Sequence, residues 1–157
     1  MHNITPFLTF PARGEEAVHF YVSIFPNSQI TGLVRSEEGG PLPAGTLLNA
    51  SFVLDGQPFM AMDGGPHFSF AQGTSFFVHC QTQEQVDYYW TRLAEGGEEQ
   101  PCGWVKDKFG LSWQIVPSIL GELMQDEDRT RAGRVMTAML TMKKIDIAAL
   151  QQAYNQE

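Results

Sequence analysis

The chain has 157 residues, of which 43% are hydrophobic and 11% aromatic, and its formal net charge is −8. This composition is sufficient for a substantial hydrophobic core and excludes an intrinsically disordered chain. The chain has only 10 basic residues and no run of them, which disfavours binding to nucleic acid or to an anionic membrane surface. No signal-like segment opens the sequence, and no apolar run approaches the ~20 residues that span a bilayer, so we expect a soluble cytoplasmic protein.

The first half of the chain is predicted to be a β-α-β-β-β module. Strands are expected at residues 3–10, 28–35, 48–54 and 57–63, and a helix with one apolar face is expected between Gly14 and Phe25. In the third strand, Leu48, Ala50, Phe52 and Leu54 alternate and should share one face. Asp55-Gly56 indicates a type I′ hairpin, so the fourth strand should return antiparallel to the third.

The second half repeats this order of elements. A strand is expected at 74–80, a helix after the capping-box pattern of Thr82 and Gln85, and two strands at 98–107 and 111–117. A shift of 68 positions places Val18 on Val86, Tyr21 on Tyr89 and Glu16 on Glu84. The order of elements, more than these identities, indicates an internal duplication.

The last predicted strand contains an amide whose role stays open. Leu111, Trp113 and Ile115 should share one face, whereas Gln114 should share the other face with Ser112 and Val116. Gln114 either bonds neighbouring backbone inside a core or points into a ligand pocket.

Residues 118–157 differ from both halves and predict three short helices, the last capped by Asp146. Met136, Met139 and Met142 recur at helical spacing. They either fill gaps in the packing of this tail or form an apolar surface that covers a partner subunit.

Four stretches of the sequence carry a family resemblance: PFLTFPARGEEAVHFYVSIFPNSQI, FMAMDGGPHFSF, CGWVKDKFGLSWQIVP and the tail RVMTAMLTMKKIDIAALQQAY. Together they resemble the PhnB-like, or demethylubiquinone methyltransferase-like, branch of the vicinal oxygen chelate superfamily. This superfamily includes glyoxalase I, bleomycin-resistance proteins and extradiol dioxygenases. The resemblance implies an α+β fold of tandem β-α-β-β-β modules whose sheets enclose a concave site, usually in a homodimer.

The resemblance also divides the chain. Residues 1–117 are expected to form a glyoxalase-like domain with modules at about 1–68 and 69–117, as the repeated order of elements also indicates. Residues 118–157 are expected to be a helical extension that packs on this domain or on a partner subunit.

The superfamily's metal enzymes hold a divalent ion with His, Glu or Gln from the first and last strands of each half. The matching positions here are Thr5 to Phe7, Met60 to Met62, Thr74 or Ser75, and Gln114. Hydroxyl, amide and apolar groups cannot neutralise a divalent cation. We therefore predict no intact metal site and no cofactor.

Seven residues are predicted to contact a ligand: Gln114, Trp104, Trp113, His67, Cys102, Phe59 and Phe68. The amide can donate and accept hydrogen bonds, and a loop histidine can act as a base or a ligand contact. Cys102 is a nucleophile only if a nearby cation or a helix N-terminus stabilises its thiolate. The aromatic residues suit a pocket wall and a core equally well.

The predicted function is small-molecule binding by a vicinal oxygen chelate protein of unknown specific activity, and no reaction is assigned. One alternative is a metal-dependent glyoxalase or dioxygenase. A second alternative is a methyltransferase, but the sequence has no G-x-G-x-x-G motif opening a helix after a strand. A third is a purely structural or partner-binding role, supported only by the methionine-rich tail.

Overall fold

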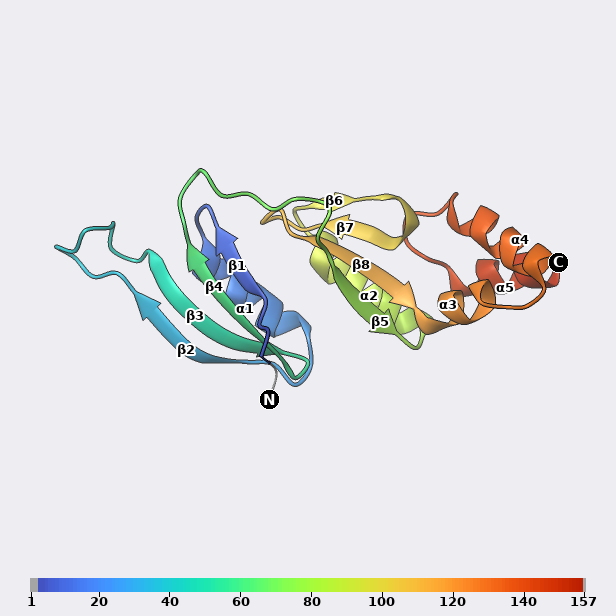
Figure 1. The fold of residues 1–157 in the computed structure, drawn as a ribbon, viewed down its shortest axis with the longest axis horizontal. Coiled ribbons are helices and arrows are strands. Elements are labelled where there is room, and N and C mark those ends of the chain that lie inside the picture. Colours follow the sequence, from blue (N-terminus) through green and yellow to red (C-terminus); the bar gives the residue numbers. More distant parts are fainter. Residues whose placement is uncertain (1–2, 157) are drawn as a thin grey trace. The chain divides into compact units, whose positions relative to one another are not determined.

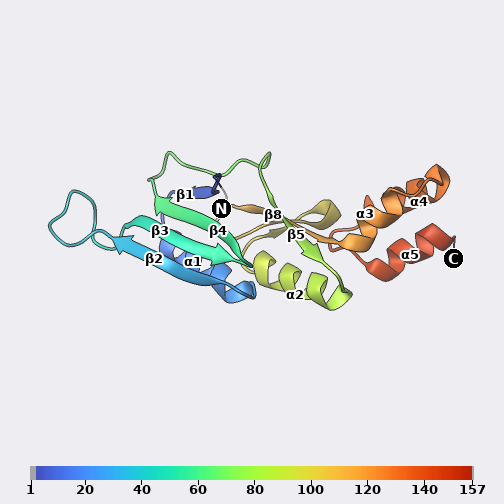
Figure 2. The same ribbon diagram turned by 60° about the horizontal axis from the view of Figure 1, so that its bottom comes forward.

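The computed structural model describes residues 3–156 and contains two compact units, the first ending at Ser69 and the second beginning at Phe70. Each unit has a four-stranded sheet with a helix packed on one face (Figures 1 and 2). Across residues 3–156, no helix combines the length and apolar character needed to cross a bilayer.

The first unit consists of β1 (Phe7–Phe10), α1 (Gly14–Ile24), β2 (Gln29–Arg35), β3 (Leu47–Leu54) and β4 (Gln57–Asp63). Its strand order is β1-β4-β3-β2, in which only the β1–β4 pair is parallel. The predicted hairpin is confirmed, because Asp55 and Gly56 have φ values of 47° and 81°, as a type I′ turn requires.

Two kinds of contact hold the helix α1 in place: burial of its apolar face and hydrogen bonds at its N-terminus. Its apolar residues at helical spacing, including Val18 and Tyr21, are fully buried against β3 and β4. At its N-terminus the backbone N–H of Gly14 donates to Oδ1 of Asp63 at 2.8 Å, and Oδ2 of Asp63 accepts from the N–H of Leu47 at 3.0 Å. The end of β4 therefore caps the helix.

The predicted alternation along β3 is wrong at its first position. Phe52 is buried, but Leu48 is 39% exposed and Leu47 is fully buried in its place. The register of β2 against β3 shifts between Val34 and Arg35, so that Leu48 has no partner in the ladder. An irregularity of this kind turns the following side chains to the other face.

The second unit carries the helical tail in addition to a sheet and a helix. Its elements are β5 (Phe76–Cys80), α2 (Gln83–Ala94), β6 (Glu98–Glu99), the 3₁₀ turn η1 (Pro101–Gly103), β7 (Trp104–Lys106), β8 (Ser112–Pro117), α3 (Ser118–Met124), α4 (Arg129–Met139) and α5 (Ile147–Asn155). The strand order is β5-β8-β7-β6, with β5 parallel to β8. The topology of the first unit is thus repeated, as the predicted duplication requires.

One predicted strand is interrupted. Residues 98–107 form β6 and β7, with η1 between them instead of a continuous strand. Cys102 and Gly103 have φ values of 62° and 83°, which lie outside the extended region. A strand cannot continue through two successive left-handed residues.

The start of α2 confirms most of the predicted capping box. The side chain of Thr82 accepts from the N–H of Gln85 at 3.2 Å. The side chain of Gln85, however, accepts from the N–H of Gln81, one residue earlier than in a standard capping box. Val86 and Trp90 then face the sheet and are buried.

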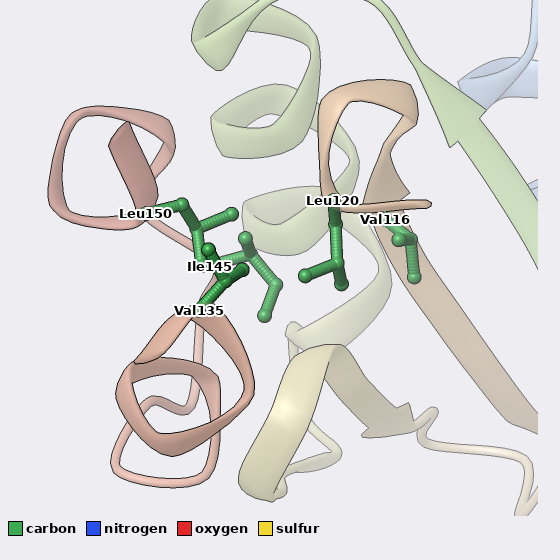
Figure 3. Packing of buried hydrophobic residues seen from close by; sticks show 5 residues of the cluster. All are labelled: Val116, Leu120, Val135, Ile145 and Leu150. Atoms are coloured by element: carbon green, nitrogen blue, oxygen red, sulfur yellow. The ribbon is translucent and has the colours of Figure 1, made fainter. Parts of the chain in front are cut away.

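Within the second unit, the helical tail packs against the end of β8 through a hydrophobic cluster (Figure 3). The cluster consists of Val116, Leu120, Val135, Ile145 and Leu150. Met139 and Met142 pack against it, whereas Met136 is 40% exposed. Two of the three methionines are therefore packing residues.

The connection between α4 and α5 is also tied by hydrogen bonds. The N–H groups of Cys102 and Gly103 donate to the carbonyls of Met142 and Lys143, each at 2.8 Å. On α2, the amide of Gln83 donates to the carbonyl of Ile145 at 3.0 Å and accepts from the following helix. The tail is thus fixed to both η1 and α2.

Candidate functional site

The second sheet has one face covered by α2 and one face that this helix leaves open. On β8, Trp113 and Ile115 are buried on the α2 side, so Gln114 points to the opposite face. The register places Phe77 of β5 and Trp104 of β7 directly opposite Gln114 on its two sides. An amide flanked by two aromatic side chains therefore forms a row across this face.

The amide of Gln114 is oriented by a neighbouring hydroxyl. Its Nε2 lies 2.9 Å from Oγ of Ser75, to which it donates. Within residues 3–156, no hydrogen-bond partner is found for its Oε1. The sequence left two roles open for Gln114. The structure favours the second: Gln114 is half-buried, its amide bonds a side chain rather than core backbone, and it presents an acceptor on the open face.

A cavity of about 620 Å³ lies between this open face and the tail. The sheet and η1 contribute Phe77, His79, Cys102, Trp104, Gln114 and Val116 to its lining. The tail contributes Leu120, Gly121, Glu122, Met124, Gln125 and Met139. The lining is predominantly apolar with a few polar groups, which is the usual composition of small-molecule sites.

The two cysteines occupy different environments. Cys102 lines the cavity, and its thiol lies 3.8 Å from the carbonyl oxygen of Met139, to which it donates. Cys80 is fully buried on the α2 side of β5, and this burial raises the pKa of its thiol to about 11. Only Cys102 is thus positioned to meet a ligand.

Two residues predicted to contact a ligand lie in the hydrophobic cores instead. Trp113 is 3% exposed, and its Nε1 donates to Oδ2 of Asp107 at 2.8 Å. Phe59 is 6% exposed and stacks on Phe52, with 5.5 Å between the ring centroids. Both side chains point to the helix-covered face of their sheet, where packing already occupies them.

The other two predicted residues, His67 and Phe68, belong to the first unit and follow β4. Both are exposed, and the ring of Phe68 lies over Gly64. All residues that line the cavity belong to the second unit. Of the seven predicted residues, the structure brings Gln114, Trp104 and Cys102 together at the cavity.

The sequence prediction missed Phe77, Met124 and Met139 as lining residues. Phe77 could have been found, because a parallel pairing of the first and last strands of the module sets it beside Gln114. The two methionines reach the cavity through the packing of α3 and α4, which no local pattern in the sequence specifies.

The residues at the expected metal positions do not fit a divalent ion. Ser75 and Gln114 are neutral and bond to each other, and in the first unit Phe7 is paired in register with Met60. In the described part of the chain, no group of three or more His, Cys, Asp or Glu gathers in a metal-binding arrangement. Neutral and apolar groups at these positions would leave the charge of a divalent cation unbalanced.

Two units of the same β-α-β-β-β topology, each joining its first and last strands in parallel, give the chain the expected glyoxalase-like fold. Residues 2–116 match the family described as 3-demethylubiquinone-9 3-methyltransferase. The chain belongs to this family. The match ends at the last strand of the second sheet, so the tail lies beyond it.

Solved structures agree with this assignment. The PhnB protein from Bacillus cereus is 37% identical over 74% of this chain and 99% of its own, with a TM-score of 0.68. Protein PA1353 from Pseudomonas aeruginosa is 22% identical over 74% of this chain and 98% of its own, with a TM-score of 0.62. The fosfomycin resistance protein FosX from Listeria monocytogenes is 16% identical over 80% of this chain and 98% of its own, with a TM-score of 0.58.

The last two similarities show the fold alone. Comparison with curated proteins finds no match.

Proposed function

We propose that the cavity on the open face of the second sheet binds a small, partly aromatic or apolar molecule. Binding of this kind, without a resident metal ion, is the function that the geometry supports best. The volume of about 620 Å³ lies in the usual range of ligand sites.

The row of Phe77, Gln114 and Trp104 carries this proposal. Phe77 is 47% exposed, although buried aromatic side chains are a major source of stability. Between the two rings, Gln114 offers an acceptor whose orientation is already set by Ser75. An aromatic surface with one oriented polar group favours binding of a molecule with both properties.

A thermal-shift screen with metals, quinones, antibiotics and thiols tests the proposal, because a ligand that binds the native state raises the Tm. A hit should protect Cys102, but not the buried Cys80, from alkylation. Replacing Gln114 by Leu should weaken the hit about tenfold or less, the range of one hydrogen bond. A screen without any stabilising compound, or hits that leave Cys102 unprotected, would contradict the proposal.

The name of the family favours a second candidate, a methyltransferase. Calorimetry with S-adenosylmethionine tests it directly. Binding with a micromolar Kd would support this candidate, whereas the absence of heat at millimolar concentration would leave the first proposal unopposed.

A metal-dependent enzyme is a third candidate, because a FosX structure from Listeria monocytogenes is described as a complex with Mn(II). Metal analysis of protein purified without chelators is the test. Stoichiometric Ni, Zn, Mn or Fe would overturn the proposal of metal-free binding, and would imply ligands other than the neutral pair Ser75 and Gln114.

We further propose that the chain acts as a homodimer in the cytoplasm. The resemblance to a superfamily that is usually dimeric supports the first part, and the two free cysteines, Cys80 and Cys102, suit a reducing compartment and support the second. Sedimentation velocity at micromolar concentrations should give a mass near twice 17.5 kDa. A single species of monomer mass would contradict the dimer.

A further inference from the structure

We infer that the cavity selects a flat aromatic ligand that is neutral or cationic and donates hydrogen bonds, and that the tail sets this preference. The inference rests on the proposed function, since it names the class of molecule that the same cavity takes. Three features of the cavity lining support it: its charge, the side chains that the sheet contributes, and the side chains that the tail contributes.

The charge of the lining disfavours anions. Among the described residues that line the cavity there is no Lys or Arg, and the single carboxylate is that of Glu122 on α3. Among the same residues the basic side chain is the imidazole of His79, and a His79→Gln variant controls for its charge. An anion that entered this cavity would lose water without meeting a compensating cation.

The groups of the sheet favour a donor that carries positive charge. The faces of Trp104 and Phe77 have the negative potential that attracts cations. Between them, Oε1 of Gln114 accepts hydrogen bonds in an orientation that the bond from Nε2 to Oγ of Ser75 sets. A planar ring with an N–H group at one end matches both features.

The groups of the tail complete the preference. Met124 and Met139 bring flexible thioether side chains to the wall that the tail forms, where they suit contact with the flat face or edge of a ring. Glu122 belongs to the same wall. Because the family match ends at residue 116, all three residues lie in the part of the chain that the family description does not include.

Three matched probes test the inference: 2-naphthoate, 2-naphthamide and 2-naphthamidinium. They share one ring system and have substituents of nearly the same shape, with charges of −1, 0 and +1. In calorimetry at about pH 8 and low salt, the amidinium should bind at least about tenfold more tightly than the carboxylate, with the amide between them. The same order should persist in a His79→Gln variant, which removes the imidazole.

Two variants that lose the same charge locate the source of the preference. Glu122→Gln should reduce the ratio between amidinium and carboxylate affinities severalfold. Glu127→Gln is the control, because this exposed residue follows α3 and does not line the cavity. Met139→Ala should weaken all three probes without changing their order.

The outcomes separate this inference from the proposed function. Binding of none of the probes would contradict the proposed function. Binding of naphthoate as tight as that of the amidinium would overturn the charge preference while leaving small-molecule binding intact. Equal effects of the Glu122 and Glu127 variants would show that net charge, rather than the tail wall, causes the preference.

Discussion

Asp107 is a buried carboxylate, only 3% exposed, at the turn between β7 and β8. Its Oδ1 accepts from the N–H groups of Phe109 and Leu111 at 2.9 and 3.0 Å, and its Oδ2 accepts from Nε1 of Trp113 at 2.8 Å. These bonds offset the cost of burying the charge, which would otherwise be several kcal/mol. One side chain thus fixes the turn and the orientation of the tryptophan in the core.

Replacing Asp107 by Asn should destabilise the protein by about 1–3 kcal/mol, because the amide NH₂ would then face the N–H of Trp113. Urea denaturation measures this change in the free energy of unfolding. In a Trp113→Phe background the same replacement should cost less, since the opposing donor is gone. Equal costs in both backgrounds would show that the bond to Trp113 contributes nothing.

At the scale of elements, the burial of apolar side chains holds the tail on the second sheet. Leu150 of α5 is fully buried in the cluster with Ile145 and Val135, whereas Leu140 at the end of α4 is 61% exposed. Leu150→Ala should therefore cost about 2–5 kcal/mol, and Leu140→Ala within about 0.5 kcal/mol. The free energy of unfolding in urea compares the two identical truncations.

The same pair of variants shows whether the tail detaches on its own. Hydrogen exchange of the α5 amides should accelerate in Leu150→Ala while exchange in β8 stays slow, if the tail opens locally. Equal acceleration in β8 would show instead that tail and sheet unfold as one cooperative unit.

Acid should weaken the attachment between the tail and α2. The pKa of Asp87 lies below its ordinary value of 3.8, because Gln83 donates to this carboxylate and Lys144 of the tail pairs with it at 2.9 Å. A lowered pKa stabilises the folded state above the ordinary value, and the contribution is lost as the pH falls through the folded pKa. Hydrogen exchange of the α5 amides, corrected for intrinsic rates, should thus accelerate as the pH falls below about 4. The acceleration should be steeper in the wild-type protein than in the Asp87→Asn variant. Identical profiles would exclude this role of Asp87.

At the scale of the whole molecule, the two thiols report on folding and on the cavity separately. Cys102 should react with an alkylating reagent in the native protein at about pH 8, whereas Cys80 should react only after unfolding, because its pKa is about 11 and it is fully buried. Mass spectrometry should find one modified thiol in buffer and two in denaturant. Rapid modification of both thiols in buffer would contradict the buried position of Cys80.

Sequence patterns predicted the order of the elements in both units, because helical spacing, alternation and turn residues are local properties. The two failures have non-local or conformational causes. Leu48 is exposed because the partner strand β2 shifts its register, and the strand expected over 98–107 breaks where Cys102 takes a left-handed conformation. A cysteine carries no general preference for that conformation, so the sequence gives no warning of it.

The candidate site was less predictable than the fold. Gln114 and Trp104 could be placed from strand alternation and family resemblance. Trp113 and Phe59 were misplaced because an aromatic residue suits a core and a pocket equally, and only the packing of the helix decides which face of a strand is covered. The helical spacing of Met139 predicts packing within the tail or contact with a partner subunit, and neither role indicates that it also lines the cavity.

The parallel pairing of β1 with β4 has a consequence for synthesis. β1 is an edge strand, and its partner in the sheet, β4, begins about 50 residues later at Gln57. β5 likewise depends on β8, which is made after α2 and the two intervening strands. During translation the first strand of each unit must remain unpaired until its last strand has left the ribosome, so each unit closes only near the end of its own synthesis.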